Sequence, residues 1–276
     1  MRAAPRVAWV ALALLGTAGS AVAQTPPEPV RDNSFLLEEA YNQETSVIQH
    51  VSLFLHSWQT GDWVYAFTQE WPLRTWRHQL SYTLALGHVD AGSATYTGPG
   101  DLGVNYRLQL AGGNGEPVAV APRVTLLFPT GSSRRGLGAG GLGMQANLPV
   151  SWQPSPALVT HWNAGATMTP RARNPTGDRA RTVAWSLGQS VIWLATPTLN
   201  FVVETVWARG EEVTGPGSTV AIEQLVIAPG LRAAMNLRGG LQVVPGVAFP
   251  IGVGPSRGKR SVALYLSFEH PLRRRE

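Results

Sequence analysis

Cysteine is absent from the 276 residues, so no disulfide can cross-link this chain. Long apolar runs are missing too: after the first residues, no window approaches the roughly 18 to 20 consecutive apolar residues that a membrane-spanning helix needs. If the chain lies in a membrane, it must therefore cross it with β-strands.

Lysine is nearly absent as well, and Lys259 is the only one, although the formal net charge is +5. The arginines are scattered over loops and single strand positions, with no basic patch that alternates with exposed aromatic side chains, which argues against nucleic acid as a partner. The six histidines stand singly, without metal-ligand spacing. The stretch "GLGAGGLG" at 136–143 lacks the Lys-Ser/Thr pair of a phosphate loop. We expect no metal and no cofactor.

The first 23 residues have the pattern of a secretory signal peptide. Two early arginines precede an apolar run over about 7–15, and the small residues "AVA" at 21–23 form a cleavage site before Gln24. An uncleaved anchor helix is the alternative, although the apolar run is too short to span a bilayer. We expect a cleaved signal peptide over 1–23 and a periplasmic segment over 24–45.

One short helix is expected in that periplasmic segment. After the proline-rich stretch "TPPEPVRDN", a cap residue (Asp32, Asn33 or Ser34) precedes apolar residues at roughly helical spacing. We expect this helix to lie at or inside the periplasmic mouth of a barrel as a plug. Its candidate plug residues are Phe35, Leu36, Leu37 and Tyr41.

From residue 46 onward, apolar and polar residues alternate in segments separated by glycine, proline and polar turn residues. We predict twelve strands, at about 46–58, 62–71, 76–88, 101–111, 117–128, 141–152, 157–169, 182–194, 199–208, 220–235, 241–251 and 260–270. Their lengths suit tilted strands that cross a bilayer, and an even number is usual for single-chain bacterial barrels. The sequence thus predicts an all-β, antiparallel transmembrane barrel over 46–271, preceded by a short helix and followed by a tail at 272–276.

The connections between these segments differ by parity. The even-numbered ones are tight, at 72–75, 112–116, 153–156, 195–198 and 236–240. The odd-numbered ones are mostly longer, at 89–100, 129–140, 170–181 and 209–219, with shorter ones at 59–61 and 252–259. Short periplasmic turns that alternate with longer outer loops are typical of outer-membrane barrels.

The two faces of each segment indicate which side meets lipid. In "DLGVNYRLQL" the even positions from Leu102 to Leu110 are large and apolar, and the odd positions include Asn105 and Arg107. We expect the large apolar faces to meet lipid and the smaller polar faces to line the lumen. Most tryptophans fall near strand ends, as two interfacial belts would require, and only Trp162 is clearly mid-strand.

Seven charged residues are predicted to face the lumen: Glu70, Arg77, Arg107, Arg123, Glu204, Arg232 and Glu269. Ion pairing across the lumen is one interpretation of these charges, and a pathway for solute is the other. Apolar residues such as Ile192, Leu194 and Val202 share the same faces. That mixture predicts a packed or narrow lumen that admits modestly apolar molecules.

Several stretches resemble a family of outer-membrane barrels named for a putative MetA pathway of phenol degradation and often labelled transporters. The similar stretches are "DNSFLLEEAYNQE" (32–44), "GPGDL" (98–102), "LGQSVIWLA" (187–195), "PIGVGPSRG" (250–258) and "LYLSFEHP" (264–271). The resemblance spans nearly all of the chain after the signal peptide and implies an outer-membrane barrel. One departure is the carboxyl end, where "EHPLRRRE" follows Phe268 in place of a terminal aromatic residue that assembly machinery reads.

An enzyme is the rival class, because a twelve-stranded barrel can carry a Ser-His-Asn hydrolase. The candidates are His161 and Asn163 with Ser151 or Ser186, although neither serine has a recognisable nucleophile context. His50 and Glu70 as an acid-base or metal pair have no better support. We therefore assign no catalytic residue.

The expected partners are outer-membrane lipid and lipopolysaccharide, the barrel assembly machinery and a small solute. The outer loops and their edges carry basic residues that form either a solvated rim or contacts with lipopolysaccharide phosphates: Arg134, Arg135, Arg171, Arg173, Arg179, Arg209, Arg257, Lys259 and Arg260. The favoured function is passive transport of a small apolar or aromatic solute across the outer membrane. A non-conducting structural or binding barrel is the alternative, and lipid hydrolysis is a third hypothesis.

Overall fold

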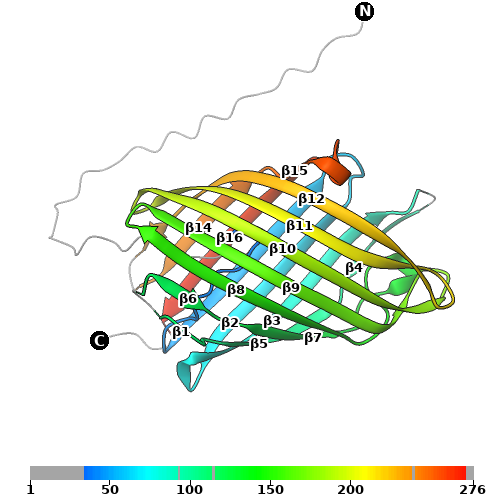
Figure 1. Cartoon of the computed structure of the whole chain (residues 1–276), viewed down its shortest axis with the longest axis horizontal. Coiled ribbons are helices and arrows are strands. Elements are labelled where there is room, and N and C mark those ends of the chain that lie inside the picture. The colour runs from blue at the N-terminus through cyan, green and yellow to red at the C-terminus, as the bar shows by residue number, and fades with distance from the viewer. Residues whose placement is uncertain (1–33, 93, 114–115, 238–239, 272–276) are drawn as a thin grey trace, which may run out of the picture.

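A computed structural model describes residues 34–92, 94–113, 116–237 and 240–271 of the chain. Within these residues the secondary structure is almost entirely β (Figure 1). The strands are β1 (Val47–Ser57), β2 (Trp63–Leu73), β3 (Thr75–Asp90), β4 (Thr95–Pro99), β5 (Leu102–Leu108), β6 (Val118–Val120), β7 (Arg123–Phe128), β8 (Gly143–Ser155), β9 (Leu158–Arg173), β10 (Arg179–Thr196), β11 (Leu199–Gly215), β12 (Ser218–Ala233), β13 (Met235–Asn236), β14 (Gln242–Ala248), β15 (Ile251–Gly252) and β16 (Ser261–Pro271). Two short 3-10 turns, η1 (Ser133–Arg135) and η2 (Gly254–Ser256), lie between strands.

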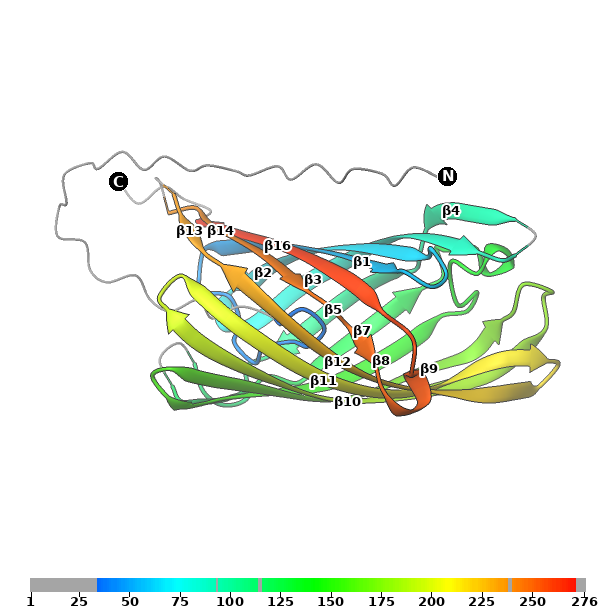
Figure 2. The ribbon, with the colours of Figure 1, turned by 90° about the horizontal axis from the view of Figure 1, so that it is seen from above.

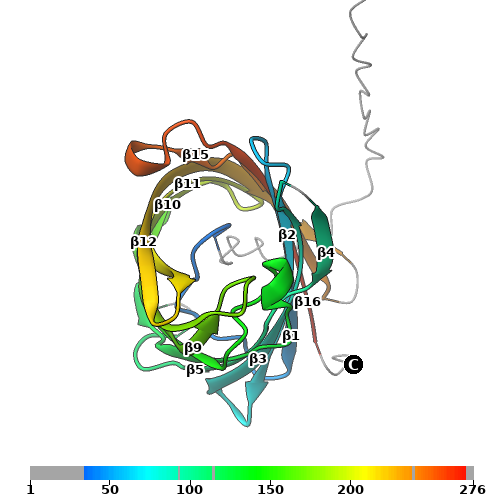
Figure 3. The same cartoon turned by 90° about the vertical axis from the view of Figure 1, so that its right-hand side faces the viewer.

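These pieces form a closed ring of twelve antiparallel strands. Three of the twelve barrel strands are interrupted, so each is made of two successive segments that pair with the same neighbour. These are β4 with β5, which pair with β3; β6 with β7, which pair with β8; and β14 with β15, which pair with β12. Pro122 and Pro250 lie at two of the interruptions, where a ring nitrogen cannot donate to the ladder. The pairings of β16 with β1 and of β12 with β14 close the ring. The predicted twelve-stranded antiparallel barrel is confirmed, and Figure 3 shows the ring end-on.

Four strands extend farther toward one end of the barrel than the sequence predicted. β9 ends at Arg173 and β10 begins at Arg179. In the next hairpin, β11 ends at Gly215 and β12 begins at Ser218. The long connections expected at 170–181 and 209–219 are therefore wrong, because those residues continue the ladder; Val213, for example, pairs with Thr219. These strands project beyond their neighbours at one end of the barrel (Figure 2). We call this the loop end, and the opposite end, where β1 begins and β16 finishes, the turn end.

The wall of the barrel is apolar on its outer face and largely polar on its inner face, which is the opposite of a barrel that is surrounded by water. Outward-facing leucines such as Leu84, Leu148 and Leu187 are about half exposed, between 44% and 55%. Inward-facing polar residues such as Asn105 and Glu204 are buried. A continuous apolar exterior of this kind is suited to lipid rather than water. Among the described residues, no helix is long and apolar enough to cross a membrane.

The expected N-terminal helix is absent from the described residues. Residues 34–44 are a bent, non-helical segment that lies inside the ring, drawn in blue in Figure 3. Its backbone N–H groups donate to side chains of the barrel wall in place of carbonyl groups one helical turn away. The spacing of Leu36, Leu37 and Tyr41 predicts a helical face, but these residues contact separate positions on the wall. The predicted signal peptide at 1–23, residues 24–33 and the tail at 272–276 lie outside the described residues.

Candidate functional site

The segment from Ser34 to Gln43, which we call the strap, crosses the lumen held by hydrogen bonds to the wall. At its start, the hydroxyl groups of Ser34 and Ser190 lie 2.7 Å apart. The next contact is with Glu204 on β11, whose Oε1 accepts from the backbone N–H of Leu36 at 2.9 Å and from that of Leu37 at 3.0 Å. Glu204 was predicted to face the lumen, and it is fully buried beneath the strap.

The rest of the strap continues around the inner wall in the same manner. Four further backbone N–H groups of the strap donate to side chains of the wall. The pairs are Glu38 to Asn163 on β9 (3.3 Å), Ala40 to Ser151 on β8 (2.7 Å), Asn42 to Gln109 next to β5 (2.8 Å) and Gln43 to Gln79 on β3 (2.8 Å). An N–H left without an acceptor in a buried place would cost free energy, so these inward polar side chains satisfy a segment that has no secondary structure of its own.

Strap carbonyl groups are bound as well. Arg107 is buried at 3% exposure and donates through Nη2 to the carbonyl of Tyr41 at 2.7 Å and through Nη1 to that of Glu39 at 3.3 Å. Its Nε donates to the side chain of Asn42 at 2.8 Å. A guanidinium group presents its donors in a fixed planar fork, which matches several oxygens at one turn of the chain.

Two ion pairs accompany these hydrogen bonds. Arg123 Nη1 lies 2.7 Å from the carboxylate of Glu38 in the strap. Arg107 Nη2 lies 3.8 Å from the carboxylate of Glu70 on the wall, which also accepts from Gln79 at 2.7 Å. Arg107 and Arg123 thus bind the strap rather than facing an empty lumen.

The apolar side chains of the strap lie against glycine positions of the wall. A Cβ atom on Gly246 would lie 2.7 Å from the ring of Phe35, and one on Gly188 would lie 2.3 Å from Leu37. The Phe35 ring also packs edge-on against Tyr265 at 5.9 Å between centroids. The candidate plug residues therefore lie inside the barrel, where Phe35, Leu37 and Tyr41 are buried and Leu36 is half-buried.

The remaining predicted lumen charges have different surroundings. Arg232 is 1% exposed and interacts electrostatically with Glu204. Glu269 is half-buried near the turn end of β16. Arg77 is exposed at the turn end, where its guanidinium group lies 5.5 Å from the ring of Trp76. Its guanidinium group therefore lies outside the buried network around the strap, although its backbone carbonyl accepts from Nδ2 of Asn42 at 3.0 Å.

The hydrolase hypothesis finds only part of its geometry. Ser151 Oγ lies 2.7 Å from Nδ1 of His161, but both residues are buried beneath the strap and Ser151 also accepts the N–H of Ala40. Asn163 bonds to Glu38 rather than orienting His161. Ser186 pairs across the ladder with Gly165. This arrangement gives a substrate no access, so we assign these side chains to holding the strap.

The pairing of His50 with Glu70 is wrong, because the two side chains lie on opposite faces of the wall. His50 stacks outside against Phe67 and Phe268, whereas Glu70 points inward. In the parts of the chain that the structure describes, no group of three or more His, Cys, Asp or Glu side chains could hold a metal ion.

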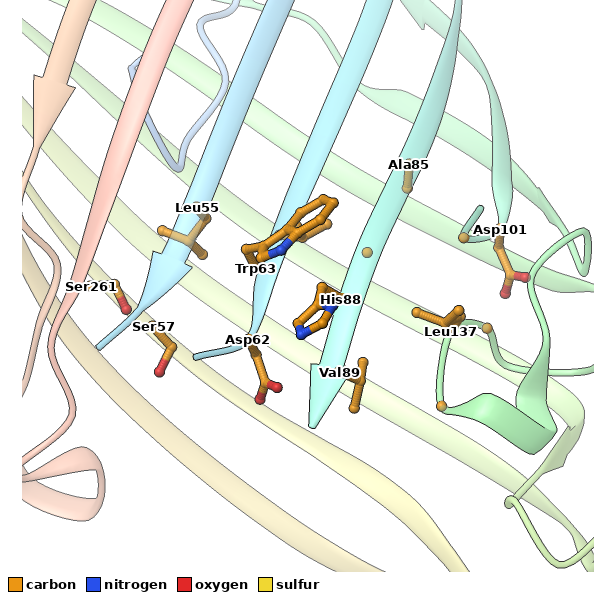
Figure 4. Close-up of a pocket in the computed structure, with 15 residues that line it drawn as sticks. Leu55, Ser57, Asp62, Trp63, Ala85, His88, Val89, Asp101, Leu137 and Ser261 are labelled. Carbon is orange, nitrogen blue, oxygen red and sulfur yellow. The ribbon is translucent and has the colours of Figure 1, made fainter. Parts of the chain in front are cut away.

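The lumen is open toward the loop end and contains a cavity there of about 490 Å³ (Figure 4). Its apolar lining includes Leu55, Val64, Ala85 and Val89 from the wall and Leu137 from the loop after η1. We call this cavity the vestibule. The loop is fixed by Asp101, whose carboxylate accepts from the N–H groups of Gly131 at 3.0 Å and Ala139 at 2.8 Å. Leu137, in the glycine-rich stretch 136–143, was not identified from the sequence as a lining residue.

The basic residues predicted at the outer rim are all exposed. The guanidinium group of Arg135 lies 5.9 Å from the ring of Tyr96. The exposed positions are thus compatible with both interpretations of the rim, solvation and contact with phosphates.

The sequence matches no protein-family model and no curated protein. Among solved structures, an outer membrane channel from Pseudomonas putida F1 aligns with a TM-score of 0.63 at 15% identity, covering 84% of this chain and 97% of that one. The NanC porin aligns with a TM-score of 0.51 at 10% identity, covering 79% of this chain and 98% of that one. The chain therefore has the fold of bacterial outer-membrane β-barrels.

Proposed function

We propose that this protein is a passive outer-membrane channel for small apolar or aromatic solutes, with the strap as the constriction of its lumen. The observation that carries the proposal is the arrangement of an apolar vestibule directly above a lumen section that the strap fills. The turn end, with its short connections, is the periplasmic side, so a solute from outside meets the vestibule first.

The vestibule supports the choice of solute. Leu55, Val64 and Leu137 offer an apolar surface, and a volume of about 490 Å³ is within the range of small-molecule sites. Asp62 and Asp101 also line the vestibule, but their carboxylates accept from backbone N–H groups of the wall and loop. A sugar channel would need a lining richer in free hydrogen-bonding groups.

The strap supports a narrow rather than a wide pore. Ser151, His161, Glu204 and Arg232 are all fully buried at its level, whereas Ser186, nearer the loop end, is exposed to the lumen. A wide aqueous porin would keep such polar groups in water. The barrel interior is thus packed in one half and open in the other.

Ion current through the protein in planar bilayers tests this proposal. We expect benzyl alcohol to reduce the current at lower concentrations than arabinose does, because only the aromatic solute matches the vestibule. Leu137→Ser should weaken that reduction, and Ser186→Ala should leave it unchanged. Equal effects of the two solutes would contradict the solute class. Absence of current both in the wild type and after removal of residues 34–43 would instead favour the non-conducting barrel.

A further inference from the structure

Three polar side chains lie together on the lipid-facing surface, where apolar residues are expected. Gln189 on β10 is the ladder partner of both Trp162 on β9 and Thr205 on β11. All three side chains point outward, and Trp162 is 47% exposed. They line one exterior groove of about 470 Å³. We call these residues the polar trio.

The polar trio is at the middle of the membrane-facing band. Along the outward face of β10, Gln189 lies midway between Trp185 and Trp193, which are 56% and 55% exposed. Tryptophans at the two ends of an outward face mark the two membrane interfaces, so Gln189 is at the depth of the hydrocarbon centre. A polar group there is costly unless it has a hydrogen-bond partner.

Several other outward polar groups of this barrel have such partners. The hydroxyl groups of Ser52 and Tyr65 lie 3.1 Å apart. The Tyr82 hydroxyl donates to Gln69 at 2.6 Å, and Tyr106 lies 2.7 Å from Nδ1 of His78. Within the described residues, by contrast, no hydrogen bond is made by the side chains of the polar trio. The amide, the indole N–H and the hydroxyl are thus available to a group outside the chain.

A shallow hollow lies beside the polar trio. A second exterior groove, of about 620 Å³, is lined by Ala146, Ala164 and Ala166 and shares Leu148, Leu187 and Trp207 with the first. The surface therefore combines a projecting indole at Trp162 with a hollow floored by methyl groups. Large side chains that fit small-residue hollows are what a close-packed contact within a membrane requires.

We propose that this face, β8 to β11, is where two copies of this chain associate in the membrane. A glutamine amide carries both a donor and an acceptor, so two copies related by a two-fold axis exchange hydrogen bonds between their Gln189 side chains. The hollow beside the polar trio lets the two walls approach closely. A lipid chain would fill the hollow but offers no group to bond with an amide at the bilayer centre, so the polar trio favours a second copy.

Cysteine cross-linking tests the proposal directly, because the chain has no cysteine of its own. Leu187→Cys in the full chain, reconstituted in lipid vesicles and oxidised, should give a covalent dimer, because Leu187 lies on the same face of β10, is 55% exposed and leaves the Gln189 amide in place. Leu84→Cys is the matched control: it is lipid-facing and 49% exposed, but it lies on β3. A dimer from Leu187→Cys and not from Leu84→Cys supports the proposal. Equal cross-linking at both sites, or none at Leu187→Cys, overturns it.

A second measurement determines the oligomeric state without cysteine substitution. Native mass spectrometry of the wild type should show a dimer, and Gln189→Leu should shift it to monomer, whereas Val191→Leu on the same face should not. A wild-type monomer that carries bound lipid, lost in Gln189→Leu, would overturn the proposal in favour of a lipid site. The barrel's heat-modifiable migration on gels reports folding of each variant.

Discussion

The carboxylate of Glu204 lies 2.9 Å from the backbone nitrogen of Leu36, although 168 positions separate the two residues. The second oxygen of the same carboxylate lies 3.2 Å from that nitrogen, and the N–H of Leu37 also donates to Oε1. These hydrogen bonds are shielded from water, which strengthens them. This contact fixes the start of the strap to the wall.

Gly246→Ala should loosen the start of the strap. The added methyl group would lie 2.7 Å from the Phe35 ring and 3.1 Å from Cβ of Arg232. Overpacking of this kind costs about 1 to 3 kcal/mol, so amide hydrogen exchange at Leu36 and Leu37 should accelerate about fivefold or more.

Gly210→Ala is the control for that substitution. Its Cβ would meet only Ala184, at 3.4 Å, which is ordinary contact. Unchanged exchange in Gly246→Ala, or equal acceleration in both variants, would show that Phe35 is not seated against Gly246.

Arg107→Ala should destabilise the folded barrel. The change removes the donors to Glu39, Tyr41 and Asn42 of the strap and the guanidinium group that lies 3.8 Å from the buried carboxylate of Glu70. Breaking a buried pair costs about 3 kcal/mol or more. Guanidinium unfolding in lipid vesicles measures the loss. Arg77→Ala, which removes an exposed charge at the turn end, should leave the midpoint nearly unchanged, and a matching loss in both would contradict the assignment.

Leu84→Arg tests which face of the wall meets lipid. Leu84 pairs with Phe67, which lies midway between the outward residues Trp63 and Trp71, and an arginine at that depth should cost about 2 to 4 kcal/mol. Val64→Arg places the same charge in the open half of the lumen, where Val64 is 39% exposed, and should cost much less. The free energies of unfolding of the two variants are the measurement. A larger loss for Val64→Arg than for Leu84→Arg would mean that the face assigned to the lumen meets lipid.

Strand number and facing were predictable because a barrel wall repeats every two residues. In β5 the alternation placed Val104 and Tyr106 outside and Asn105 and Arg107 inside, as the structure does. Strand ends were less predictable. Residues near Glu211 and Val213 are polar or mixed because they extend past the lipid band, so their alternation fades while their backbone pairing with Ala221 and Thr219 continues.

The sequence predicted that the strap lies inside the barrel, but it predicted a helix where the structure has a non-helical segment. Its leucines and glutamates favour a helix in isolation, and the competing hydrogen-bond partners come from Glu204, Ser151 and Gln109, which are far away in sequence. A signal was present in Gly188 and Gly246, two glycines on inward faces of strands, where a side chain approaches closely. The polar trio was equally visible in sequence as a break in the apolar face of β10.

The most direct test of the strap as the constriction combines an engineered disulfide with the removal of one hydrogen-bond acceptor for the strap. Ser34→Cys and Ser190→Cys replace hydroxyl groups 2.7 Å apart and should form a disulfide that ties the strap to β10, in a chain that has no other cysteine. Glu204→Ala in the same molecule removes the acceptor for Leu36 and Leu37.

Single-channel conductance of this triple variant is the measurement. Our account predicts a low conductance, equal to that of the wild type, while the disulfide is intact and a higher one after reduction, whereas the double-cysteine protein with Glu204 present should change little on reduction. The same conductance in the oxidised and reduced triple variant would contradict the strap as the constriction of the lumen.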